Sequence, residues 1–363
     1  MKFRNYINWL MLTIVLLLTI AACAGRFNRI ERQIVPIAAA NRTDCRQIQH
    51  VAGTTQICGR PQRIAVLGPY LLEPLLALDV QPIAFGDYAA WHRGQYTNPR
   101  QQIPYLGDRI TGSIANLGMV GTPSVEALLK VKPDLILGID IANAQHYPTL
   151  SKIAPTLILK WGDSDRNLQT ISQAVDHADR ATALLSEMKQ QIATARQEFA
   201  PLVAARPKLL LLISAELREI GLVTKYYDRC NSLPQALGFE LVYPSQLDRS
   251  QLETPAPISI ETFADLDRAD AIVLLGHNFR DSPQNQIADG FATSVLNKLK
   301  QAWAKNPSAK LLKASKAGRV YFMPSYLCLG LPGPIGTNLY LNEFKQQLLP
   351  SKMGLKPLPL QSP

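Results

Sequence analysis

The side chains best suited to chemistry in this sequence are aromatic and basic residues that follow short apolar runs. They are Tyr70, Tyr88, Trp91, Arg93 and Trp161 in the first half, and Arg218, Tyr226, Tyr227, His277, Arg280 and Tyr326 in the second. Aromatic rings stack on the organic part of a ligand, and guanidinium groups neutralise carboxylate or hydroxamate oxygens. These residues are therefore candidates for binding an anionic organic ligand; the alternative is that loop aromatics only cover the edges of the fold.

The elements that would position these residues follow from an alternation of short apolar runs with helical patterns. The apolar runs cover residues 63–67, 82–86, 134–138, 155–159, 208–213, 239–242, 270–275 and 319–322. Such alternation is typical of βαβ units in parallel sheets with both faces covered. Ligands bind beyond the carboxyl ends of such strands, where the candidate residues fall. We therefore predict an α/β fold with two lobes and mainly parallel sheets, with the ligand site in the loops beyond the strands.

A long helical pattern separates the two halves. Apolar residues recur every three or four positions from Ala181 to Leu202, Asp179 can cap the start, and Pro207 lies beyond the end. This pattern predicts a single stiff helix that joins the lobes; the alternative is a surface helix of one lobe. The predicted organisation is a signal peptide (1–22), a tether (23–44), an N-terminal lobe (45–165), a connecting helical segment (166–205), a C-terminal lobe (206–350) and a tail (351–363).

The first residues indicate export. Lys2 and Arg4 precede an apolar run over 10–20 that is too short to span a bilayer, and Ile20-Ala-Ala-Cys23 follows. This ending resembles a bacterial lipobox, which implies a lipid on Cys23 and a protein anchored at the periplasmic or cell surface. The alternative is an ordinary signal peptide with a chance cysteine. The net charge of +10 invites anionic partners, but export excludes nucleic acid.

Four further cysteines form an even set, which suits an oxidising compartment and allows three pairings. Residues 46–57 read as a hairpin that turns near Gly53, so a Cys45–Cys58 bridge is favoured and Cys230–Cys328 remains as the second pair. A four-cysteine zinc site is the alternative, but no CxxC spacing supports it. Similarly, His92, His146 and His277 lack HxH or HExxH spacing, so solvated loop histidines are favoured over metal ligands.

Two segments, 122–138 and 259–276, share an order of features. Each has a hydroxyl residue expected to cap a helix (Thr122 and Ser259), a glutamate in the first turn (Glu126 and Glu261), and an aspartate that opens a buried strand ending in glycine. The helix dipole explains an acid at either position. It does not explain the matched placement in two lobes.

Several motifs occur in a fixed order, and together they carry a family resemblance. They are His50-Val-Ala-Gly-Thr-Thr, Pro61–Leu67, Leu75–Pro82, Pro123–Leu129, Lys132–Ile136, Ile260-Glu261 and Ala317–Tyr321. Over residues 45–349 the chain resembles the periplasmic binding proteins of ABC transporters that import iron–siderophore complexes, haem or cobalamin. The resemblance implies two α/β lobes bridged by a long helix, ligand held between them, and Glu126 and Glu261 docked on arginines of the permease.

The resemblance implies a lipid-anchored, non-enzymatic monomer that delivers a ferric siderophore to an ABC permease and its ATPase, with no resident cofactor or metal. Hydroxamate-binding relatives carry an aromatic at the place of Trp91. They also carry a chelate-binding arginine where this chain has Val120-Gly121, which leaves Arg93, Arg218 and Arg280 as substitutes. Haem or cobalamin binding is an alternative. An envelope α/β hydrolase is another, but the sequence lacks a Gly-x-Ser-x-Gly elbow.

Overall fold

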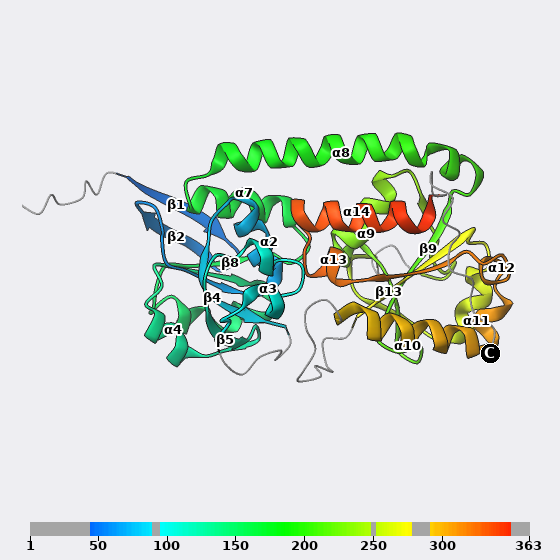
Figure 1. Ribbon diagram of the computed structural model, residues 1–363, viewed down its shortest axis with the longest axis horizontal. Coiled ribbons are helices and arrows are strands. Elements are labelled where there is room, and N and C mark those ends of the chain that lie inside the picture. The colour runs from blue at the N-terminus through cyan, green and yellow to red at the C-terminus, as the bar shows by residue number, and fades with distance from the viewer. Residues whose placement is uncertain (1–43, 89–94, 248–251, 278–290, 350–363) are drawn as a thin grey trace, which may run out of the picture. The chain divides into compact units, whose positions relative to one another are not determined.

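The computed structural model describes residues 44–88, 95–247, 252–277 and 291–349, and the side chains of all of these except 260, 261, 291 and 292. The described residues from Cys45 onward belong to one compact unit. An antiparallel hairpin opens it, made of β1 (Cys45–His50) and β2 (Gly53–Cys58). Two α/β lobes follow, joined by one long helix (Figure 1). This confirms the predicted fold class.

The N-terminal lobe has a six-stranded sheet in the order β6-β5-β4-β3-β7-β8, parallel except for β6. Its strands are β3 (Ile64–Leu67), β4 (Pro82–Asp87), β5 (Ala115–Met119), β6 (Thr122–Pro123), β7 (Leu135–Ile139) and β8 (Thr156–Leu159). One face is covered by α2 (Pro69–Ala77) and α7 (Ser164–Ala174), and the other by α4 (Val125–Val131). Short helical turns complete the lobe: α3 (Pro99–Gln102), η1 (Gly107–Arg109), α5 (Asp140–Asn143), η2 (Ala144–His146) and α6 (Tyr147–Leu150).

The C-terminal lobe is built on a second sheet, in the order β12-β10-β9-β13-β14 with β11 also paired to β9. Its strands are β9 (Lys208–Ser214), β10 (Ile220–Leu222), β11 (Glu240–Leu241), β12 (Ala256–Ile258), β13 (Ala271–Gly276) and β14 (Val320–Pro324). One face packs on α9 (Arg229–Ala236), α13 (Tyr326–Leu329) and α14 (Pro334–Leu348). The other packs on η5 (Ile260–Leu266), α10 (Phe291–Lys305), α11 (Pro307–Leu311) and α12 (Lys313–Lys316). A short turn, η3 (Lys225–Tyr227), precedes α9.

The connector is α8 (Ala178–Ala205), a 28-residue helix that lies alongside α14 (Figure 1). Its first half buries Leu184 and Met188 in the N-terminal core, and its second half buries Ala195 and Phe199 in the C-terminal core. It is therefore shared by both lobes, as predicted, and is not a surface helix of one. It starts one residue before Asp179, which lies in the first turn and does not cap it. Residues 166–174 belong to α7, whose apolar side chains pack in the N-terminal core.

The two segments with matched features differ locally from the expectation. Ser124, not Thr122, caps α4, because its Oγ accepts the Ala127 N–H at 3.1 Å while Thr122 joins β6. The corresponding element η5 is a 3₁₀ helix, and Ser259 makes no capping hydrogen bond with its side chain. The shared order of hydroxyl, glutamate and strand is present in both lobes, but only one lobe forms an α-helix with a side-chain cap.

Both predicted disulfides are present. Cys45–Cys58 joins directly opposed residues of the hairpin, and Cys230–Cys328 joins α9 to α13. Among the described residues there is no helix whose length and apolar character would let it span a bilayer.

Candidate functional site

The two lobes meet at a corner where the N-terminal loop between β8 and α7 contacts the C-terminal segment around η3. The Trp161 Nε1–H donates to the Tyr226 carbonyl at 2.9 Å. Asp228 Oδ2 accepts from the Tyr70 hydroxyl and from the Ser164 backbone N–H, both at 3.1 Å. We call this set of residues the inter-lobe corner. It brings together residues that lie about 65 to 160 positions apart in the chain.

Four of the predicted ligand-binding residues form a continuous aromatic array at the corner. Trp161 stacks on Tyr70 with ring centroids 4.8 Å apart, and the ring of Tyr226 lies 5.9 Å from that of Trp161. Tyr227 meets Tyr226 edge-on at 5.2 Å. Tyr70 is fully buried, whereas the other three rings are partly exposed. The array therefore offers aromatic surface from both lobes to a ligand.

Local backbone geometry places these side chains. Gly68 follows β3 with a φ of 116°, which favours glycine, and Pro69 then starts α2 so that Tyr70 lies in its first turn. Gly162 has a φ of 78°, and its N–H donates to the Tyr70 hydroxyl at 3.2 Å. Asp228 has a φ of 42°, a strained value for a residue with a side chain. The bonds from Tyr70 and Ser164 help to hold that conformation.

The corner also contains a buried cation that the sequence analysis did not select. Arg229 donates to Asp165 at 2.5 Å, to the Ser164 hydroxyl at 3.3 Å and to the Pro332 carbonyl at 3.1 Å. With these partners it closes the corner and does not present its charge to a ligand. Burial raises the pKa of Tyr70 well above its ordinary value, and the charge of Asp228 raises it further. Tyr70 therefore acts as a neutral hydrogen-bond donor.

A second group of tyrosines surrounds the buried Asp87 at the end of β4. Burial and the nearby Asp87 raise the pKa values of Tyr88, Tyr96 and Tyr326. Tyr326 of the C-terminal lobe stacks on Tyr105 of the N-terminal lobe at 5.8 Å, and only 2% of it is exposed. Tyr326 thus lies at a contact between the two lobes. Tyr88 is near both this group and Tyr226, since Asp87 and Tyr226 each raise its pKa.

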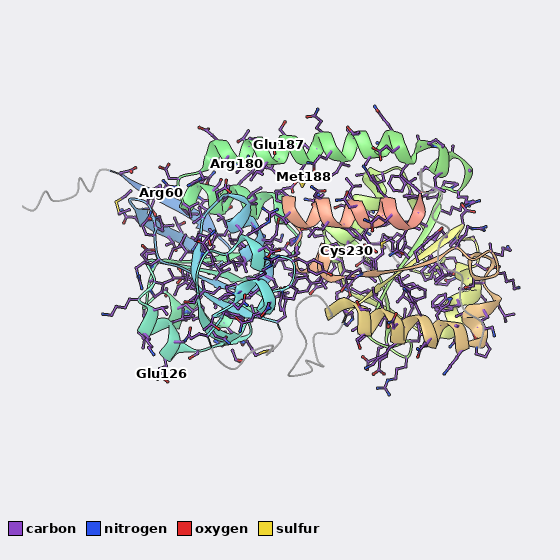
Figure 2. All side chains as sticks on the ribbon, viewed as in Figure 1. Arg60, Glu126, Arg180, Glu187, Met188 and Cys230 are labelled. Atoms are coloured by element: carbon purple, nitrogen blue, oxygen red, sulfur yellow. A yellow bond between two sulfur atoms is a disulfide. The ribbon has the colours of Figure 1, made fainter. Side chains whose placement is uncertain are left out.

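The remaining predicted residues fall in different places. Arg218 is largely exposed and pairs with Glu216 at 2.7 Å in its own loop. His277 directly follows β13, and its backbone N–H donates to the Ser214 carbonyl at 3.0 Å. Glu126 is exposed at the outer edge of α4 (Figure 2). The other predicted positions lie outside the described residues or side chains: Cys23, Trp91, Arg93, Glu261 and Arg280.

Glu73 is a fully buried carboxyl group that links α2 to the start of α14. Its Oε1 accepts the Ile335 N–H at 2.6 Å, and a Cβ at Gly333 would lie 2.0 Å from its Oε2, so a side chain there would displace the Glu73 carboxyl group. Burial raises the pKa of Glu73 to about 7, although the α14 N–H groups and Arg229 favour the charged form. The only sequence signal is a single acid within the apolar run from Tyr70 to Leu78.

The raised pKa predicts a pH-dependent stability. Because the folded chain binds this proton more tightly than an unfolded chain, whose Glu73 titrates near 4.5, the contribution of Glu73 is fully present below that value. It is lost as pH rises to about 7, a loss of about 3 kcal/mol. We expect urea unfolding to show this loss in the wild type relative to Glu73→Gln, compared below about pH 5 and above about pH 8. Parallel pH profiles for the two proteins would contradict it.

A surface groove of about 430 Å³ lies between α8 and α14, lined by polar side chains such as Gln190 and Asn338. None of the predicted ligand-binding residues lines it. We therefore locate the candidate ligand site at the inter-lobe corner and not in this groove.

Comparison with known proteins identifies the family. The family model described as periplasmic binding protein matches residues 64–327, which include both sheets and the connector. The chain belongs to the periplasmic binding protein family. This is a class of substrate-binding proteins, so an envelope hydrolase is not supported.

Relatives within the periplasmic binding protein family resemble this chain over most of its length. The probable siderophore-binding lipoprotein YfiY of Bacillus subtilis is 24% identical over 96% of this chain and 100% of its own length. The ferric enterobactin-binding periplasmic protein FepB of Escherichia coli is 31% identical over 59% of this chain and 68% of its own. The structure of Staphylococcus aureus SirA, solved with staphyloferrin B, matches this chain with a TM-score of 0.66 at 20% identity. The match covers 84% of this chain and 98% of the SirA chain. The last match supports the two-lobed fold.

Proposed function

We propose that this chain captures a ferric siderophore between its lobes and delivers it to the permease of an ABC importer. The observation that carries the proposal is the aromatic array at the inter-lobe corner, to which both lobes contribute partly exposed rings. Such rings stack on the organic shell of a chelate. A ligand that contacts Trp161 and Tyr226 touches both lobes at once and stabilises one arrangement of the two.

The relatives support an iron chelate as the ligand. The names of YfiY and FepB refer to siderophore and ferric enterobactin binding, and SirA was solved with staphyloferrin B. Their chelates differ in chemistry, so these names support the ligand class and not one compound. The pairing of Arg218 with Glu216 and of Arg229 with Asp165 leaves stacking as the main contribution of the described site residues.

The partners follow from the same proposal. Exposed Glu126 on α4, and Glu261 in the matched segment, would form charge-assisted hydrogen bonds to arginines of the permease, whose ATPase drives import. A lipid on Cys23 would hold the protein at the membrane, in the periplasm or on the cell surface. The words lipoprotein and periplasmic in the names of relatives support this placement.

The test is a titration of tryptophan fluorescence with ferric siderophores of hydroxamate, catecholate and citrate type, and with haem and cobalamin. We expect a ferric siderophore to change the emission at micromolar concentration, because Trp161 lies at the corner. A response to cobalamin or haem alone would identify that compound, and not a ferric siderophore, as the ligand. Silence toward all of these compounds would reject the proposal.

Trp161→Ala should weaken siderophore binding by up to roughly tenfold, because one aromatic stacking contact is lost from the site. Trp161→Phe should retain most of the affinity. The matched control is Trp303→Phe, since Trp303 is buried beside Phe263 in the C-terminal core, away from the corner. Calorimetric titration measures the siderophore affinity of all three variants. An unchanged affinity in Trp161→Ala would remove Trp161 from the site.

A further inference from the structure

One stretch of the C-terminal lobe has an unusual charge. From Phe291 to Asn342 the sequence contains seven basic residues and no aspartate or glutamate, whereas the whole chain has a net charge of only +10. The basic residues are Lys298, Lys300, Lys305, Lys310, Lys313, Lys316 and Arg319. Most of the excess positive charge of the protein is therefore concentrated in one short segment.

The six lysines of this segment lie on α10, α11 and α12, three helices that contact one another in succession (Figure 1). α10 buries Val295, Leu299 and Trp303 against the sheet. Lys298 and Lys305, seven residues apart, lie on one flank of that helix. All six lysines are exposed, and within the described residues only Lys313 has an acidic partner, Asp267 at 3.5 Å. We call the six lysines, with Leu311, the basic face.

An exposed leucine lies within this charge. Leu311 ends α11 directly after Lys310 and is 67% exposed, the highest value among the exposed large apolar side chains of the described residues. Its neighbour Leu312 is buried, so Leu311 is not needed for the core. A soluble anion would gain nothing from an apolar side chain at this place. A bilayer surface uses both kinds of group, because ammonium groups bind the phosphates and an apolar side chain enters the acyl boundary.

We propose that the basic face binds the anionic phospholipid headgroups of a membrane surface. This goes beyond the proposed transport function, since it requires neither ligand nor lipid anchor. The arrangement suits docking: α11 packs against η5, the turn that carries Glu261. The basic face covers the C-terminal sheet on the side away from α8. In the N-terminal lobe, α4 with Glu126 also lies on the sheet face away from α8.

The test measures sedimentation of residues 45–363, the compact unit without leader or anchor, with phosphatidylcholine vesicles that contain or lack phosphatidylglycerol. We expect binding only to the anionic vesicles, weakened by salt. Each lysine at such a surface strengthens binding by roughly fivefold. The triple variant Lys305→Glu, Lys310→Glu, Lys316→Glu should therefore lose more than about tenfold in affinity. Adding Leu311→Ser to this triple variant should weaken binding to the anionic vesicles further.

A matched triple variant separates a specific face from net charge alone. Lys152→Glu, Lys189→Glu, Arg196→Glu changes the charge equally at exposed positions of the N-terminal lobe and α8. It should keep most of the vesicle binding. Equal losses in the two triples, or equal binding to neutral and anionic vesicles, would overturn the proposal. If the basic-face triple binds vesicles normally but binds solubilised permease poorly, the face contacts protein and the membrane assignment is wrong.

Discussion

Uptake of the ferric siderophore should fall by more than about tenfold when Glu126 and Glu261 are both replaced by alanine, while ligand affinity stays unchanged. Each truncation would leave a permease arginine without its partner, and such a loss costs about 2–5 kcal/mol when the pair is desolvated. Glu126 is exposed and lies on α4, away from the inter-lobe corner, so its removal should not disturb the ligand site. Cellular uptake of radiolabelled iron, with calorimetric titration of the purified variant, measures both quantities.

The control for that experiment removes two acids that do not belong to the matched segments. Glu187 on α8 and Glu240 on β11 are both exposed, and Glu187→Ala with Glu240→Ala changes the net charge by the same amount. This control should transport normally. Normal transport by the Glu126/Glu261 variant would reject the docking role, even with the ligand proposal intact.

The second large effect concerns stability. Replacing Cys230 and Cys328 by alanine should lower the free energy of unfolding by about 4–5 kcal/mol, because the disulfide closes a loop of 98 residues and restricts the unfolded chain. The bridge also ties α9, which directly follows Asp228, to α13, which begins at Tyr326. Cys230 is labelled in Figure 2. Asp228 and Tyr326 both contact the N-terminal lobe. We therefore expect ligand affinity to fall as well.

The hairpin disulfide supplies the comparison. Cys45 and Cys58 are separated by only 13 residues, so their replacement should cost less, about 3 kcal/mol. Urea unfolding of both double variants under non-reducing conditions measures the difference. The same or a larger loss from the hairpin pair would contradict the chain-entropy explanation.

Local patterns were enough to predict much of this fold. The buried strands, such as β9 and β13, are continuous apolar runs, and the apolar stripe of α8 identifies a helix with two partners. Tyr70 and Trp161 could be chosen as candidates because they follow the parallel strands β3 and β8, and ligand-binding loops follow such strands. In each case a short-range signal was combined with a general rule of topology.

The contacts between the two lobes could not be predicted, because they join residues far apart in sequence. Glu73 meets Ile335 across 262 positions, and no local pattern indicates that pairing. No sequence pattern indicates the role of Asp228, because that role depends on an unusual backbone conformation and on donors from the other lobe.

The continuity of α8 has a mechanical consequence. Met188 belongs to one core and Ala195 to the other, so the length of helix between them is about two turns, roughly 10 Å. Ile192, within that length, packs against both cores. A rotation of one lobe against the other must therefore be absorbed as elastic bending or twisting of these two turns. A ligand that drew the lobes together would therefore bend or twist these two turns, and the elastic recovery of the helix would favour reopening once the ligand had left.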